Sequence, residues 1–161
     1  MKPDFNAVSL YDYPDLLAAL QNAYCDTCPF NAFLEVSIKS LDPVELHMPM
    51  RPELIGNAHR KMLHGGVIAA YLDNVCGTAS GMMVVKRRLA EGVAWQEAVK
   101  ALTRHATIDL RTDFLQPGIG KKFIGRAEVI RSGSRINVVR GELLNDAGEL
   151  IALGTGAFRY S

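Results

Sequence analysis

One segment constrains the fold of this chain more than any other, because the 21 residues from Gly65 to Val85 carry a single charged side chain, Asp73. Small or apolar residues lie on every face, which is typical of a helix surrounded by protein or of a membrane span. Asp73 and Asn74 at mid-span would cost about 2–3 kcal/mol or more in lipid. The sequence therefore predicts a buried central helix, closed by three cations that suit the negative end of its dipole: Lys86, Arg87 and Arg88.

The residues before this helix predict one further helix and a β-hairpin. Residues 12–25 have apolar side chains at the spacing that lines one helical face. Phe33–Leu41 and Val44–Met50 alternate in character on either side of Asp42-Pro43, which predicts two antiparallel strands joined by a turn. Arg51–Leu63 contains proline and glycine and predicts a loop.

The residues after the central helix predict a short helix over Val93–Arg104 and then four strands. Brief turn sequences separate these strands, and such short connections predict an antiparallel meander. The fold class is therefore α+β, with a sheet wrapped around one helix. The four predicted strands are Ala106–Leu115, Lys121–Arg131, Arg135–Leu144 and Leu150–Tyr160.

Length and charge narrow the possible partners. A chain of 161 residues that is 48% hydrophobic suffices for one compact domain and is short for two. Its 18 Lys and Arg residues nearly balance 17 Asp and Glu residues, and both signs are spread along the chain. We therefore expect one domain over residues 1–161, with neither a nucleic acid nor a membrane as partner.

The N-terminus and the cysteines favour a cytoplasmic location. Residues 1–6 contain an acid and a proline where a secretory signal needs a positive region followed by an apolar run. Three cysteines cannot form a complete set of intramolecular disulfides. Cys25 and Cys28 have the spacing of a redox or half-zinc motif but lack further ligands, so we expect free thiols there and a core role for Cys76.

Asp73 is the first candidate for chemistry. A carboxylate in a buried helix is costly to desolvate and needs either a partner or a purpose. A structural role, such as capping a backbone group or pairing with Arg111, is the alternative. The residue type alone leaves both interpretations open.

A second candidate site lies at the start of the same helix. His64-Gly65-Gly66 directly precedes the apolar segment, so the Gly65 and Gly66 amides are among the unpaired donors of its first turn. Such donors bind anions and can hold the oxyanion that forms when a carbonyl is attacked. The alternative is a helix start with flexible glycines and no ligand.

The segment from His64 to Asp73, with the acid nine positions after the histidine, resembles the PaaI-type hotdog thioesterases of the 4-hydroxybenzoyl-CoA thioesterase-like superfamily. Residues 107–117 are similar to the strand that follows the central helix in that family, and residues 148–156 to its last strand. The resemblance covers about residues 33–160. It implies a hotdog fold, an antiparallel sheet of about six strands wrapped around a central helix. Residues 1–30 are then an N-terminal helical extension, and residues 86–105 a helical insertion longer than the usual link.

The resemblance also implies roles for individual residues in hydrolysing an acyl-CoA thioester without a cofactor. Gly65 gives the oxyanion-hole amide, and Asp73 acts as general base or nucleophile. His64 and Asn57 orient the loop and the thioester, although Asn57 lies seven residues before His64 where the family has six. Thr107 positions the attacking water.

Helix geometry adds an expectation about assembly. Gly65 and Asp73 are eight residues apart, which is about 12 Å along a helix axis. One protomer therefore cannot direct both at one carbonyl. If they act on the same thioester, a two-fold dimer must join Gly65 of one chain to Asp73 of the other, giving two equal sites. The resemblance implies the same homodimer, often paired into a dimer of dimers.

The remaining polar residues give weaker indications. Arg131, Ser134 and Arg135 surround a tight turn and, with Gly66, are candidates for binding the phosphates of CoA, although a charged hairpin tip is an equal alternative. The isolated histidines lack the spacing of a metal site, so no metal is expected. These histidines are His47, His59 and His105.

Two functions from different classes follow. The first is an acyl-CoA thioesterase; the second is a non-catalytic acyl-thioester binding protein that uses the same cradle. A protein that only binds the thioester does not need a carboxylate such as Asp73 in an apolar setting, so the presence of Asp73 favours the hydrolase. A hotdog dehydratase is disfavoured because no second histidine and acid are placed to remove a proton next to the carbonyl.

Overall fold

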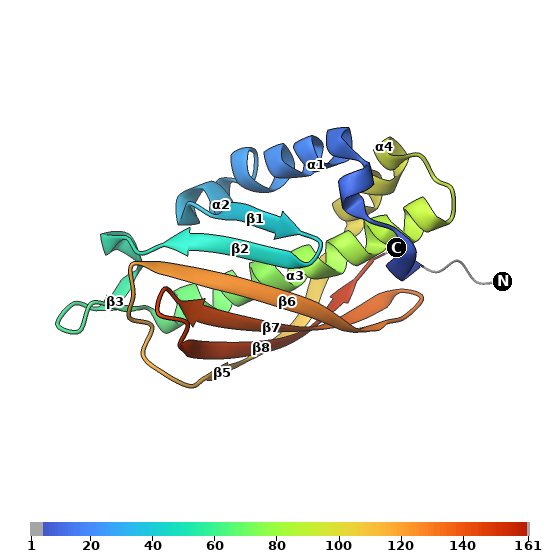
Figure 1. Cartoon of the computed structure of the whole chain (residues 1–161). Helices are drawn as coiled ribbons and strands as arrows, with labels where there is room; N and C mark the ends of the chain where they lie inside the picture. Colours follow the sequence, from blue (N-terminus) through green and yellow to red (C-terminus); the bar gives the residue numbers. More distant parts are fainter. Residues whose placement is uncertain (1–4, 161) are drawn as a thin grey trace.

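The fold consists of a six-stranded antiparallel sheet with one long helix, α3 (Gly65–Ala90), packed across it (Figure 1). The structure is a computed structural model that describes residues 5–160, apart from the side chain of Asn6. Residues 1–4 and 161 of the predicted domain lie outside the described part. The central helix is confirmed, and it continues through Lys86–Arg88 to Ala90, so these cations occupy its last turns.

The strands lie in the order β1-β2-β6-β7-β8-β5, and every neighbouring pair is antiparallel. This confirms the sheet of about six strands and the hotdog fold. Their bounds are β1 (Ser37–Leu41), β2 (Val44–Pro49), β5 (Ala106–Phe114), β6 (Lys122–Ser132), β7 (Ile136–Asn145) and β8 (Leu150–Arg159).

The predicted four-strand meander is wrong for its first strand. β6, β7 and β8 follow one another, but β5 pairs with β8, from Ala106 opposite Arg159 to Phe114 opposite Ala152. The reason is that β2 already occupies the other edge of β6. A short connection allows two strands to pair but does not require it. β5 therefore forms an edge of the sheet.

Glycines let α3 lie close to the sheet. A Cβ atom at Gly125 of β6 would lie 2.4 Å from Val75 Cγ2, and one at Gly141 of β7 would lie 2.6 Å from Cys76 Sγ. Both distances are shorter than any ordinary contact. Because Gly125 and Gly141 have no side chains, Val75 and Cys76 pack directly on the strand backbone, where both are fully buried.

Short helices form a further layer on α3 (Figure 1). The helix predicted over residues 12–25 consists of α1 (Pro14–Gln21) and a π-helical turn, η3 (Asn22–Asp26). The helix predicted over 93–104 consists of α4 (Trp95–Ala98) and the 3-10 helix η5 (Val99–Arg104). The positions of both predicted helices are confirmed, although each consists of two consecutive helical segments.

Two local predictions need correction. Phe33 and Leu34 belong to a helix, α2 (Pro29–Leu34), because Pro29 is preset for a first helical turn, and the strand begins only at Ser37. The predicted loop before α3 contains a small hairpin of β3 (Ile55–Asn57) and β4 (Met62–Leu63). This hairpin lies directly before the first turn of α3 and helps to fix it.

α3 is long and apolar enough to cross a membrane by length and composition alone. In the fold, 61% of its most apolar 18-residue window is buried. Tyr71 and Leu72 are fully enclosed between the sheet and the short helices.

Candidate active site

The first turn of α3 presents one free amide. His64 is the N-cap residue, and its Nδ1 accepts a hydrogen bond of 2.9 Å from the Gly66 amide, which requires the ring proton on Nε2. The Val67 and Ile68 amides donate to the His64 carbonyl at 2.9 and 3.2 Å. Among the described residues, none accepts a hydrogen bond from the Gly65 amide. Gly65 is solvent-exposed, so this donor is available to an anionic atom.

The structure brings Asp73 and Thr107 together. Asp73 lies on α3 and is half-buried, and Thr107 Oγ1 on β5 donates a hydrogen bond of 2.9 Å to Asp73 Oδ1. The alternative partner, Arg111, instead binds Asp113 on its own strand through Nε at 3.1 Å and Nη2 at 3.0 Å. Asp73 therefore has a hydroxyl partner and is not held by that guanidinium.

The Asn57 side chain binds within its own turn, and its role in orienting the loop and the thioester stays a prediction. It lies exposed at the end of β3, and its Oδ1 accepts a hydrogen bond of 3.1 Å from the Arg60 amide across the turn. The neighbouring Gly56 is the residue that contacts His64, since a Cβ atom there would lie 2.6 Å from His64 Cα. Sequence reasoning missed Gly56, although a glycine beside Asn57 was a readable sign of close backbone approach.

A cavity of about 580 Å³ opens beside Asp73. It lies between α3, the segment from α1 to α2, and the segment from η5 to β5, and most of its lining is apolar. Among its lining residues, only Asp73 and Thr107 were predicted from the sequence to belong to the site. The lining also includes Tyr24, Asn31, Asn74, Gly77, Leu102 and His105.

His105 shares this cavity with Asp73. Its ring stacks on Phe158 with centroids 5.6 Å apart, and its Nε2 lies 2.8 Å from Ser80 Oγ. Burial lowers the pKa of His105, and the nearby charge of Asp73 opposes this in smaller part. The spacing of His105 and Thr107 was a usable sign of this, because residues two apart on an extended segment share a face.

The Arg131–Arg135 turn lies at the far end of α3. Arg87 Nη1 donates to the Gly133 carbonyl at 2.7 Å, and Arg87 Nη2 to Ser132 Oγ at 2.9 Å. Arg87 is 22 residues beyond Gly65, or about 33 Å along the helix axis. One protomer therefore does not bring this turn to its own Gly65. Arg131, Ser134 and Arg135 are all exposed.

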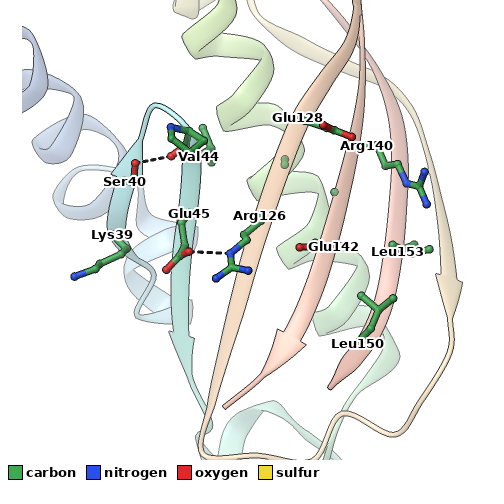
Figure 2. Close-up of a pocket in the computed structure, with 13 residues that line it drawn as sticks. Lys39, Ser40, Val44, Glu45, Arg126, Glu128, Arg140, Glu142, Leu150 and Leu153 are labelled. Atoms are coloured by element: carbon green, nitrogen blue, oxygen red, sulfur yellow. Dashed lines mark hydrogen bonds and ion pairs between the residues drawn. The ribbon is translucent and has the colours of Figure 1, made fainter. Parts of the chain in front are cut away.

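A second hollow, of about 650 Å³, lies on the opposite face of the sheet (Figure 2). Its charges alternate between neighbouring strands: Arg126 Nε is 2.8 Å from Glu45 Oε2, and Glu128 lies opposite Arg140. Gly125 and Gly141 on the same strands face α3, so these charged side chains point away from it. Their mutual compensation is typical of a solvated sheet surface, and the hollow is separate from Asp73.

The thiols do not contribute to this site. Burial raises the pKa of Cys76 to about 12, which agrees with a core role, and all three cysteines are free. Within residues 5–160, no group of three or more His, Cys, Asp or Glu side chains is placed to hold a metal ion.

A six-stranded antiparallel sheet packed on one long central helix defines the class of hotdog-fold proteins. Comparison with known proteins specifies the family. Residues 61–152 match the family model described as "Thioesterase superfamily". The chain belongs to this superfamily, and the class of enzyme is a thioester hydrolase.

Three relatives illustrate the match. The medium/long-chain acyl-CoA thioesterase YigI of Escherichia coli K12 is 34% identical over 134 residues, which cover 81% of this chain and 84% of YigI. A crystal structure from Shewanella oneidensis, related to the thioesterase superfamily, has a TM-score of 0.83 at 38% identity and covers 91% of this chain and 96% of its own. A candidate thioesterase from Syntrophus aciditrophicus has a TM-score of 0.82 at 33% identity, covering 94% and 99%.

Proposed function

We propose that this chain hydrolyses acyl-CoA thioesters to a free acid and CoA in the cytoplasm, as a homodimer with shared active sites. The observation that carries the proposal is the Thr107–Asp73 hydrogen bond at the mouth of a largely apolar cavity. The name of the YigI relative supports acyl-CoA as the substrate. A hydroxyl-bound carboxylate beside an apolar space suits an acyl chain attached to a carbonyl that must be attacked.

In the proposed reaction, Asp73 removes a proton from a water that Thr107 helps to position. The water oxygen attacks the thioester carbon, and the Gly65 amide holds the resulting oxyanion. The carbon–sulfur bond then breaks, and the proton on Asp73 passes to the departing CoA sulfur. Alternatively, Asp73 itself attacks to give an anhydride that water opens. Oxygen-18 from labelled water enters Asp73 during a single turnover only in this second route.

The edge strand supports the shared site. Thr107 and Asp73 lie near the start of β5, and Gly65 lies at its end, because a Cβ atom on Gly65 would be 3.5 Å from the Phe114 ring. Two antiparallel copies of β5 paired about their midpoint, Leu110, would set Thr107 of one chain opposite Asp113 of the other, next to the partner's Phe114. Gly65 of the partner would then approach Asp73. The exposed Ile108 (53%) and Phe114 (56%) on this strand would be covered by such pairing.

A thiol-release assay on acyl-CoA substrates tests the proposal. We expect the wild type to release CoA, and Asp73→Ala to lower kcat by about 10²–10⁴-fold. Asp15→Ala, which removes an exposed acid from α1, is the control and keeps wild-type rates. The non-catalytic alternative predicts acyl-CoA binding by calorimetry with no release from any substrate, and that result would overturn hydrolysis.

A further inference from the structure

We infer that the cavity beside Asp73 is an acyl-chain pocket of limited depth, closed over Gly81 by Tyr24 and Leu102, and that it selects medium-chain substrates. This inference rests on the proposed function. It assigns chain-length selection to the N-terminal helices and to the 86–105 segment. Tyr24 lies outside residues 61–152, which match the superfamily model, so this wall comes from the N-terminal extension.

Most polar side chains around the cavity are already paired within the protein, which leaves a largely apolar interior, although no described residue pairs with the Tyr24 hydroxyl at the closed end. The Asn74 side chain donates to Asn31 Oδ1, and Asn31 Nδ2 donates to the Tyr24 carbonyl at 2.8 Å. Thr78 Oγ1 donates to the Asn74 carbonyl at 2.8 Å, and His105 is paired with Ser80. A guest that needs no hydrogen bonds, such as a methylene chain, therefore fits this space better than a polar one.

The closed end of the cavity is defined by contacts at Gly81. A Cβ atom on this buried glycine would lie 2.9 Å from the Tyr24 hydroxyl and 3.0 Å from Leu102 Cδ2. Tyr24 comes from the π-helical turn η3, and Leu102 from η5. Both side chains thus lie over Gly81, and the α3 residues that line the cavity end at Thr78, one turn before Gly81.

The depth follows from helix geometry. Gly81 lies eight residues beyond Asp73, so the closed end is about 12 Å along the helix axis from the acid. An extended chain with carbon–carbon bonds of about 1.5 Å advances roughly 1.3 Å per carbon. The pocket therefore accommodates about nine carbons beyond the scissile carbonyl.

Gly77 lies between the acid and the closed end and lines the cavity. A Cβ atom there would meet Phe158 Cε1 at 3.5 Å and His105 Cε1 at 4.0 Å, which are ordinary contacts. A valine at this position would fill the pocket about 6 Å beyond Asp73. Leu102→Ala instead lengthens the pocket, because it removes part of the side chain that closes its end.

The test is a chain-length profile of kcat/KM on butyryl-, octanoyl-, decanoyl-, myristoyl- and palmitoyl-CoA. For the wild type we expect a rise of up to about fourfold per methylene as far as decanoyl-CoA, followed by a fall at myristoyl-CoA. Gly77→Val should lower the decanoyl to butyryl ratio at least tenfold. Leu102→Ala should move the optimum to a longer chain, and it remains informative if Gly77→Val fails to fold. Lys100→Ala, on the exposed side of η5, is the control and keeps the wild-type profile.

Decanoate binding, measured by calorimetry, separates this inference from the proposed function because it needs no turnover. Decanoate binding that Gly77→Val abolishes, in a protein that releases no thiol, overturns hydrolysis and supports the pocket. Acyl-CoA hydrolysis with the same chain-length profile in wild type, Gly77→Val and Leu102→Ala overturns the pocket and leaves hydrolysis intact.

Discussion

The Thr107 hydroxyl donates a hydrogen bond of 2.9 Å to Asp73 Oδ1 and so joins the edge strand β5 to the central helix α3. This bond fixes the orientation of one carboxylate oxygen and leaves the other free. Because Asp73 is only half-buried, a water or a carbonyl can reach the free oxygen from the cavity. The pair thus links the packing of the sheet to the proposed chemistry.

Removing the Thr107 hydroxyl should impair turnover. A hydrogen bond to a charged group contributes about 1.5–3 kcal/mol, so Thr107→Val should lower kcat by roughly 10- to 100-fold. Thr107→Ser retains the hydroxyl and should remain within a few-fold of the wild type. Steady-state thiol release from one acyl-CoA measures both. Equal rates for Thr107→Val and the wild type would show that the bond has no part in the reaction.

Much of the fold was predictable from local patterns. The apolar segment of α3 and the turn sequences between the later strands placed these elements within a few residues. The position of β5 beside β8 was not predictable in this way, because it depends on which strand edge is already occupied by β2. Strand pairing of this kind is a property of the whole sheet.

The site was predictable only where its residues lie close in sequence. His64, Gly65 and Asp73 lie within ten residues at the start of α3; the family resemblance of this segment predicted their roles, and their helical spacing predicted the two-fold partner. The cavity was not predictable, because Tyr24, Asp73 and Leu102 come from three distant segments that only tertiary packing brings together. The role of Asn57 stays a prediction, and its side chain accepts a hydrogen bond within its own turn.

The close packing of α3 on β6 predicts a stability effect. Gly125→Ala would place a Cβ atom 2.4 Å from Val75 Cγ2 and 3.0 Å from Tyr71 Cε1, so the buried helix must move. We expect a loss of about 1–3 kcal/mol in the free energy of unfolding, measured by urea denaturation. Gly77→Ala, whose Cβ meets only ordinary contacts, should be neutral or stabilising by up to about 1 kcal/mol. An unchanged midpoint for Gly125→Ala would contradict the packing described.

The half-buried His105 predicts a loss of stability on mild acidification. Burial lowers its pKa below the ordinary value of 6.5, so the unfolded chain binds a proton at a higher pH than the native chain does. The contribution of neutral His105 to the free energy of unfolding is fully present above pH 6.5, and it decreases as the pH falls from there toward the pKa in the native state. His105→Gln should therefore show a smaller decrease between pH 7.5 and about 5.5. Urea unfolding at each pH, with the exposed His59→Gln as a matched exchange, measures the difference; an equal slope in wild type and His105→Gln would contradict it.

The amide of Gly65 can be deleted with little other change. Proline is tolerated at the first position of a helix, and the residue before it must be extended, as His64 is with φ −65° and ψ 137°. A Cβ atom at Gly65 meets only the Phe114 ring, at 3.5 Å. Gly65→Pro should therefore fold normally yet lower kcat by about 10²–10³-fold, the cost of one oxyanion donor. Gly65→Ala keeps the amide and is the control.

Mixing two inactive chains tests whether the site is shared. A Gly65→Pro chain still carries Asp73, and an Asp73→Ala chain still carries the Gly65 amide. In a mixed dimer one site receives both intact groups and the other receives neither, so random re-association of equal amounts should restore about a quarter of wild-type sites. Thiol release is measured before and after subunit exchange, which native mass spectrometry monitors. If mixed dimers form and activity stays at the level of the separate variants, Gly65 and Asp73 do not act across the interface, because complementation requires each group to come from a different chain.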